Sequence, residues 1–263
     1  MLSADGKRLI YEKPQLVETI CQLRFPAILS IETKEPAEFQ DRIREMFPRY
    51  ACQTETVPQL GGAQPQREKN HSFISADGMS KLSLAKDFIA LSTMRYQGWE
   101  QFAGMLDEPL GQFISLYKPA FFERIGLRYV NGFSRSALGL EDCRWSELLH
   151  RQYLGVLGDD GVDEGGVKRC SVDVERTLRD GCTLKLHAGP GRVRRNVRTA
   201  EGGVQTVQEP EVRFMLDLDL FFLETVRLGA AAERMETLHR NADEVFADAI
   251  SDRLHGAMEP VVL

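Results

Sequence analysis

Apolar and polar residues alternate in several segments of the chain, and this period of two predicts β-strands with one buried face. In the first half the alternation covers residues 17–25, 72–85 and 87–96. In the second half it covers residues 121–133, 167–178, 182–189 and 212–223. Asp77-Gly78 and Asp180-Gly181 lie between alternating runs, where an Asp-Gly pair is typical of a two-residue hairpin turn.

Four other segments have apolar residues three or four positions apart, which predicts amphipathic helices. They are residues 37–47, 99–119, 145–157 and 232–258. Pro48 ends the first of these helices, and Pro109 could interrupt the second. Residues 52–70 are polar and contain glycine and glutamine, so we expect a long loop there.

Both halves of the chain therefore repeat one order of elements, β-α-β-β-β-α. We place the halves at residues 1–119 and 120–263, which could also form one continuous domain. ETICQLRF in the first half resembles ERIGLRYV in the second at an offset of about 105 residues. Short strands can resemble each other by chance, so an internal duplication stays open. The predicted class is α+β, with a curved antiparallel sheet, helices on one face and two tandem pseudo-repeats.

Ionisable side chains recur on the side of three strands that faces away from the predicted core. In residues 212–223, for example, leucine and phenylalanine occupy the core positions, so the aspartates point the other way. The residues placed on this polar face are Glu18, Arg24, Arg124, Arg128, Asp217 and Asp219. They could form cross-strand ion pairs on a solvated sheet. They could instead form a concave, mixed-charge site, in which arginine offers bidentate contacts to a polar ligand or a partner peptide.

The composition is that of a soluble globular protein, because 43% of the 263 residues are hydrophobic and 27% are charged. No apolar run approaches the roughly 18 residues that a membrane helix needs, and the N-terminus lacks the apolar region of a secretory signal. The five cysteines are scattered without a Cys-x-x-Cys pair. We therefore expect reduced thiols in a cytoplasmic protein, with no zinc site.

The net charge of −6 and the sequence pI near 5.5 disfavour non-specific binding to nucleic acid. Residues 187–199 are the local exception, because they contain four arginines and no acidic residue. Glycine and proline predict a mobile loop here, which could contact phosphate or simply be solvated. No aromatic residue is interleaved to stack on bases, which weakens a single-strand interpretation. The four arginines are Arg192, Arg194, Arg195 and Arg198.

Other candidate chemistry is weaker. Residues 158–166 crowd four carboxylates but lack the ligand spacing of a calcium-binding loop, which favours a flexible acidic connector. No two of the five histidines share metal-ligand spacing, so we predict no metal and no cofactor. Ser251 and His255 are one helical turn apart but have no nucleophile turn beside them. His239 has the neighbours of a histidine at the edge of a core.

Four segments resemble a sporadically distributed family of bacterial proteins of about this length with no established activity. The segments are YEKPQLVETICQLRFP, PAFFERIGLRYVNGF with the following WSELL, FMLDLDLF and LHRNADEVFADAISDRLHGAM. The matching motif positions are Pro14, Leu16, Glu18, Arg24, Phe25, Arg124, Ile125, Gly126, Leu127, Arg128, Tyr129 and Asn131. Gln15 stands where the family usually has proline. The resemblance covers nearly the whole chain and adds Asn131 to the candidate polar face. The family's patchy distribution suggests an accessory system, such as a defence system.

We therefore expect a non-enzymatic binding or interaction protein that uses the polar face of its sheet. Its partner would be a protein or an anionic small ligand. The alternative is a metal-dependent RNA- or nucleotide-processing enzyme, in which Arg128 clamps phosphate and Asp217 or Asp219 acts as base or metal ligand. The oligomeric state is left open.

Overall fold

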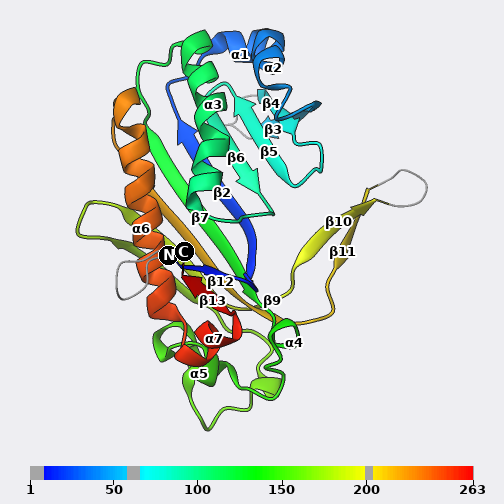
Figure 1. Ribbon diagram of the computed structural model, residues 1–263, viewed down its shortest axis with the longest axis vertical. Coiled ribbons are helices and arrows are strands. Elements are labelled where there is room, and N and C mark those ends of the chain that lie inside the picture. The colour runs from blue at the N-terminus through cyan, green and yellow to red at the C-terminus, as the bar shows by residue number, and fades with distance from the viewer. Residues whose placement is uncertain (1–8, 58–65, 199–203, 263) are drawn as a thin grey trace.

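The computed structural model describes residues 9–57, 66–198 and 204–262. Within these ranges nine strands form one open sheet in the order β3-β4-β5-β6-β2-β7-β12-β9-β8, and every pairing is antiparallel (Figure 1). The first half contributes β2 (Leu16–Arg24), β3 (Arg49–Val57), β4 (Gln66–Ile74), β5 (Ser80–Ala85) and β6 (Phe88–Thr93). The second contributes β7 (Arg124–Phe133), β8 (Val172–Thr177), β9 (Thr183–Gly191) and β12 (Arg213–Phe222). The predicted α+β class and antiparallel sheet are confirmed.

Two smaller sheets flank the large one. Strand β1 (Leu9–Tyr11) pairs with β13 (Pro260–Val262), which brings the two described ends of the chain together. Strand β10 (Arg194–Arg198) pairs with β11 (Val204–Gln208) in a hairpin that extends away from the body (Figure 1).

Two 19-residue helices, α3 (Trp99–Tyr117) and α6 (Ala231–Ala249), lie on the same side of the sheet (Figure 1). Helix α6 packs against β7 and β12, and α2 packs against α3. The shorter α-helices are α1 (Leu29–Thr33), α2 (Ala37–Ile43), α4 (Arg135–Leu138), α5 (Trp145–Leu148) and α7 (Asp252–Ala257). The 3-10 turns are η1 (Arg151–Tyr153), η2 (Gly155–Gly158), η3 (Glu164–Gly166) and η4 (Leu228–Ala230).

The core lies between the sheet and these helices. Successive side chains on a strand point to opposite faces, so alternate residues of each strand enter it. Leu23 of β2, Leu127 of β7 and Leu218 of β12 are at most 1% exposed, as are Leu106 of α3 and Leu238 of α6. The opposite face of the sheet receives the intervening residues, and we call it the open face.

The strand order is mirrored about the central pair β2–β7. Strands β6, β5 and β4 follow β2 on one side, and β12, β9 and β8 follow β7 on the other. Strand β6 leads into α3 as β12 leads into α6. The first half has the extra edge strand β3, and the second half has the β10–β11 hairpin between β9 and β12. One sheet thus runs through both predicted halves.

Three expectations about local structure were wrong. The predicted loop at residues 52–70 contains most of β3 and part of β4, since an edge pair is held by backbone bonds without a strong apolar alternation. The predicted helix at 145–157 ends at Leu148 and gives way to 3-10 turns, one of which begins at Gly155 with a φ of +54°. The predicted helix at 232–258 is interrupted at Ile250, which is extended and bridges to Leu149.

Three further local predictions changed in detail. Helix α3 is continuous through Pro109, which is buried within its packed face. The basic segment 187–199 is mostly strand, because its first residues belong to β9 and residues 194–198 form β10. Both Asp-Gly hairpins form, and Gly78 and Gly181 adopt φ values of +76° and +83°. Neither loop is the predicted two-residue turn, since the backbone pair Ser75–Ser80 closes the first and the pair Leu178–Cys182 closes the second.

Candidate functional site on the open face of the sheet

The open face carries charged side chains from strands that are distant in sequence but adjacent in the sheet. Thr19, Cys21 and Leu23 of β2 are fully buried, so the intervening residues of this strand point to the open face. The same alternation holds in β7 and β12. The residues that share the open face on the three central strands include Glu18, Gln22, Arg24, Arg124, Arg128, Asp217, Asp219 and Phe221.

Arg128 and Asp217 form a two-pronged ion pair at the centre of this face. The Nε of Arg128 donates to Oδ1 of Asp217 at 2.7 Å, and its Nη2 donates to Oδ2 at 2.5 Å. The pair is diagonal, because Asp219 is the residue directly opposite Arg128. The hydrogen bonds that Arg128 donates to Asp217 raise the pKa of Arg128 above its ordinary value. The Arg128 side chain is 46% exposed, so its guanidinium is fixed in orientation and still reaches solvent.

Arg124 is held more tightly and lies deeper. Its Nη2 donates to both carboxylate oxygens of Asp219, at 3.1 and 3.2 Å, and its Nη1 donates to Oε1 of Gln22 at 3.2 Å. The guanidinium carbon is 4.4 Å from the centre of the Phe221 ring, a cation–π distance. Gly126 makes this pose possible, because a Cβ at that position would collide with the guanidinium. Only 17% of the Arg124 side chain is exposed, which indicates a structural role.

The charge alternation continues towards the β8 edge. Lys185 of β9 pairs with Glu175 of β8 at 3.4 Å, and His187 pairs with Asp173 at 2.7 Å. All four side chains are at least half exposed. The open face from β2 to β8 therefore presents opposite charges in close succession rather than a field of one sign.

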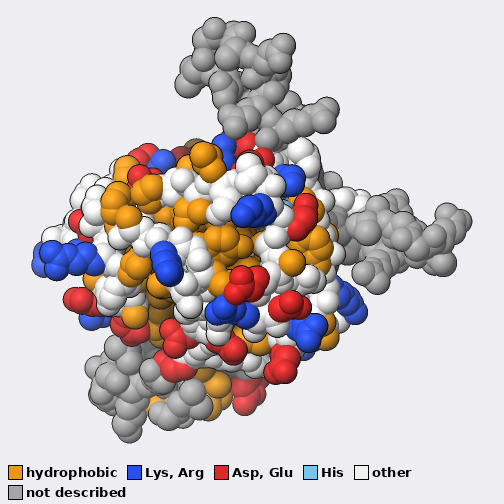
Figure 2. All heavy atoms as spheres, turned by 90° about the horizontal axis from the view of Figure 1, so that it is seen from above, with side chains coloured by type: hydrophobic (Ala, Val, Ile, Leu, Met, Phe, Trp, Pro, Cys, Tyr) orange, Lys and Arg blue, Asp and Glu red, His pale blue; other side chains and the backbone are white. Residues whose placement is uncertain are grey.

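Mixed charge alone does not distinguish this face. Figure 2 views the molecule from above, and acidic and basic side chains also lie next to one another there, with apolar side chains between them. The distinguishing feature of the open face is that its arginines are held by bidentate contacts on a rigid sheet. Such pre-organisation lowers the entropy cost of presenting a guanidinium to a partner.

The remaining predicted residues have different surroundings. Arg24 lies at the end of β2, and its Nη2 is 3.3 Å from Oδ2 of Asp87. Glu18 is half-buried opposite Val130, and its charge contributes to the raised pKa of Arg128. Asn131 does not belong to the open face. It is 4% exposed among the core residues, and its Nδ2 donates to the backbone oxygen of Leu216 at 3.3 Å.

The basic segment is separate from the open-face arginines. Arg192 is exposed, and its Nε donates to the backbone oxygen of Pro210 at 3.3 Å. Arg194, Arg195 and Arg198 are residues of β10, and their side chains lie outside the described part of the chain. The sheet register nevertheless fixes their backbone positions opposite Gln208, Val207 and Val204.

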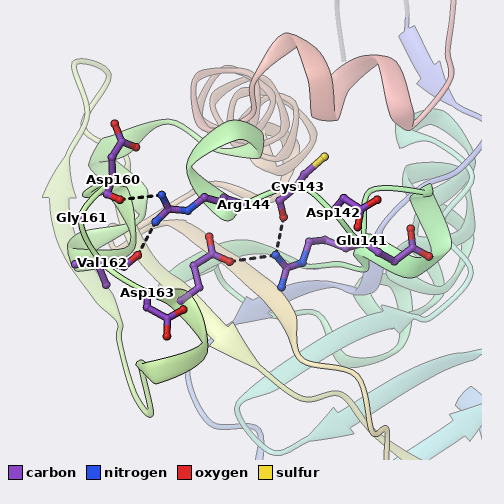
Figure 3. A pocket seen from close by; sticks show the side chains of 10 residues that line it. Glu141, Asp142, Cys143, Arg144, Asp160, Gly161, Val162 and Asp163 are labelled. Atoms are coloured by element: carbon purple, nitrogen blue, oxygen red, sulfur yellow. Dashed lines mark hydrogen bonds and ion pairs between the residues drawn. The ribbon is translucent and has the colours of Figure 1, made fainter.

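The acidic connector at 158–166 lines a shallow cavity of about 500 Å³ with residues 141–144 and Arg135 (Figure 3). Two backbone oxygens of this segment accept hydrogen bonds from the guanidinium of Arg144. Nη1 donates to the backbone oxygen of Asp160 at 3.0 Å, and Nη2 donates to that of Val162 at 2.5 Å. Glu164 is bonded to Arg135 at 3.1 Å. Arginines thus bind the backbone of this segment and the carboxylate of Glu164, while Asp159 and Asp163 accept bonds from the backbone of Gly161 and Gly165.

Other reactive groups are accounted for by packing. Burial raises the pKa of the Cys21 thiol to about 12 and that of Cys182 to about 11, so both stay protonated. Ser251 caps α7 by accepting a bond from the Leu254 backbone at 3.3 Å. His239 stacks on Trp99, with ring centres 4.6 Å apart, at the edge of the core as expected. Within the described ranges, no three His, Cys, Asp or Glu side chains could hold a metal ion together.

Sequence reasoning underrated several members of the open face. Phe221 contacts the Arg124 guanidinium, and Lys185 and His187 extend the row of polar side chains. The signal that could have found them is the same alternation that identified Asp217 and Asp219. Alternation had placed Gln22 on this face beside Glu18 and Arg24, but its contact with Arg124 was not predicted.

No family model matches the chain, and no curated protein is significantly similar to it. Among the helices of the described residues, none has the length and apolar character needed to cross a membrane.

Proposed function

We propose that this chain is a non-enzymatic cytoplasmic binding protein that holds a partner protein on the open face of its sheet. Membership of the sporadically distributed bacterial family, and a role in an accessory system such as defence, belong to the same proposal. The observation that carries it is the geometry of Arg128. This guanidinium is fixed by Asp217 yet half exposed, and among the described residues its Nη1 has no acceptor.

A polypeptide suits this face better than a compact ligand. Charges of both signs extend from β2 to β8, a distance of about 19 Å at the usual spacing between strands. An extended peptide could place carboxylates and backbone oxygens against Arg128 and Lys185, and basic groups against Asp217 and Glu175. Such complementarity favours specificity and correct register over raw affinity.

The alternative of a metal-dependent RNA- or nucleotide-processing enzyme draws no support from the contacts. It requires Asp217 or Asp219 as a base or metal ligand, whereas each carboxylate is engaged by an arginine. Turnover of a nucleic-acid substrate that depends on Mg²⁺ and is lost in Asp217→Asn would revive it.

The test is affinity capture from a bacterial lysate with three forms of the protein. Arg128→Ala removes the exposed guanidinium, and Arg44→Ala is the matched control because Arg44 is 69% exposed on another surface. We expect one protein to be captured by the wild type and by Arg44→Ala but lost with Arg128→Ala at unchanged thermal stability. Equal capture by all three forms would end the assignment to this face.

A further inference from the structure

The β10–β11 hairpin, which we call the arm, is the element least explained by the fold. Figure 1 shows it leaving the body between β9 and β12. Its strands pair with each other from Arg194–Gln208 to Arg198–Val204, and neither joins the nine-stranded sheet. A lone two-stranded ribbon is only marginally stable in water. A binding partner that packs against the ribbon would therefore stabilise it.

The arm is basic in an acidic chain. Residues 192–208 contain four arginines and one acidic residue, Glu201, whereas the whole chain has a net charge of −6. Strand β11, with the sequence VQTVQ, carries no charge. At the base of the arm, Glu209 pairs with Arg213 at 2.6 Å. The arm therefore keeps a net positive charge.

Distance separates this charge from that of the acidic body. A five-residue strand is about 17 Å long, whereas the Debye length at physiological ionic strength is about 8 Å. Salt therefore screens most of the body's negative charge along the outer part of the arm. The objection that a net charge of −6 opposes nucleic-acid binding does not apply to an element that stands clear of the body.

The shape of the arm selects among polyanions. The major groove of B-form DNA is about 12 Å wide and admits a two-stranded β-ribbon. The major groove of A-form RNA is too narrow and deep for one. Arginine suits bidentate contact with phosphate, and the exposed Gln208 supplies a neutral amide to sugars or base edges. We propose that the arm, whose strand β10 contains three arginines, binds duplex DNA by entering its major groove.

The experiment measures fluorescence anisotropy of a labelled duplex DNA of about 20 base pairs over a series of salt concentrations. If four arginines each neutralise one phosphate, the logarithm of the binding constant falls with the logarithm of salt with a slope of about −3.6. This slope corresponds to a loss of affinity of about 150-fold between 50 and 200 mM salt. Replacing Arg192, Arg194, Arg195 and Arg198 with glutamine should abolish the binding and the slope.

The matched control removes the same charge from the body. Arg44, Arg95, Arg151 and Arg240 are all exposed there, and their replacement by glutamine gives the same net charge as the arm variant. We expect this control to keep at least a third of the wild-type affinity, and both variants to keep the wild-type melting temperature. Equal losses in the two variants would show a non-specific charge effect and overturn the proposal.

Competitors distinguish the other polyanions. We expect unlabelled duplex DNA to displace the probe at least tenfold better than duplex RNA of the same sequence or polyglutamate. Better competition by polyglutamate would assign the arm to an acidic protein, and equal competition by duplex RNA would remove the groove argument; either result overturns the proposal. Arg128→Ala leaves the arm unchanged and should bind DNA normally, so this test and the capture test fail independently.

Discussion

The two open-face arginines differ in what surrounds them, although they are four residues apart on one strand. Arg124 is 17% exposed and its guanidinium also contacts Gln22 and Phe221. Arg128 is 46% exposed, and among the described residues its guanidinium is bonded only to Asp217. Solvent screens an exposed pair more strongly than a partly buried one. Similar residues in one strand therefore have different energetic roles.

Double-mutant cycles measure this difference. We expect a coupling free energy of about 1 kcal/mol for Arg124 with Asp219, and about half of that for Arg128 with Asp217. Each cycle uses the two single alanine variants and the double variant, with unfolding followed in urea. Adding about 1 M salt should reduce the coupling of the Arg128 pair by the larger fraction. An Arg128 coupling that equals or exceeds that of Arg124 would contradict the assignment of Arg124 to structure.

At the residue scale, the sequence predicted which side chains share a face but not which of them bind. Alternation placed Asp217 and Asp219 opposite the core. The choice of Asp217 as the partner of Arg128 depends on the register between β7 and β12, which is a long-range property. Asn131 shows the limit of a motif: its spacing from Arg128 is three residues, so it falls on the other face of the strand and is buried.

Turns were predictable at the scale of the element because their chemistry is local. Gly78 has a φ of +76°, which a side chain disfavours even though the space around it is empty. Gly104 lies in α3, and a Cβ there also meets nothing within 4 Å. The two glycines therefore differ in backbone conformation and not in crowding.

Alanine at these two positions should have opposite effects. We expect Gly78→Ala to lower the free energy of unfolding by about 1–2 kcal/mol, because the left-handed conformation is strained for alanine. Gly104→Ala should raise it by about 0.5–1 kcal/mol, because alanine loses less conformational entropy in a helix. Urea unfolding of both variants gives the two signs directly. A change of the same sign in both would show that the turn is not limited by its backbone.

Elements governed by tertiary packing were less predictable. Residues 145–157 have helical spacing, yet the helix ends at Leu148 because Leu149 is extended and forms a backbone bridge to Ile250. Leu148 and Leu149 are both buried in the core. Strands β3 and β4 lack a clear alternation in the segment that was expected to be a loop, and backbone pairing with each other supplies their stability. In both cases distant partners override local propensity.

At the scale of the whole molecule, the sequence predicted two halves with one order of elements, whereas neither the mirrored strand order nor the contact between the halves was visible in it. Strand β2 of the first half pairs along its length with β7 of the second. Cys21 of β2 also contacts Met235 of α6, with the two sulfurs 3.5 Å apart. The halves therefore share both a sheet and a core, so neither half can lose its structure without exposing the other's apolar surface.

This sharing predicts that the chain unfolds as one cooperative unit, and the two tryptophans make the prediction measurable. Trp99 lies in α3 of the first half and Trp145 in α5 of the second, and both are less than 10% exposed. In Trp145→Phe, fluorescence reports on Trp99, which belongs to the first half and stacks on His239 of the second, whereas circular dichroism reports on the whole chain. In Trp99→Phe, fluorescence reports on the second half. We expect the two signals to give the same urea midpoint within each variant, because a shared β2–β7 interface couples the halves.

Comparing signals within one variant removes any difference in stability between the variants. Midpoints that differ by more than about 0.5 M in either protein would mean that the halves unfold separately, as independent domains would.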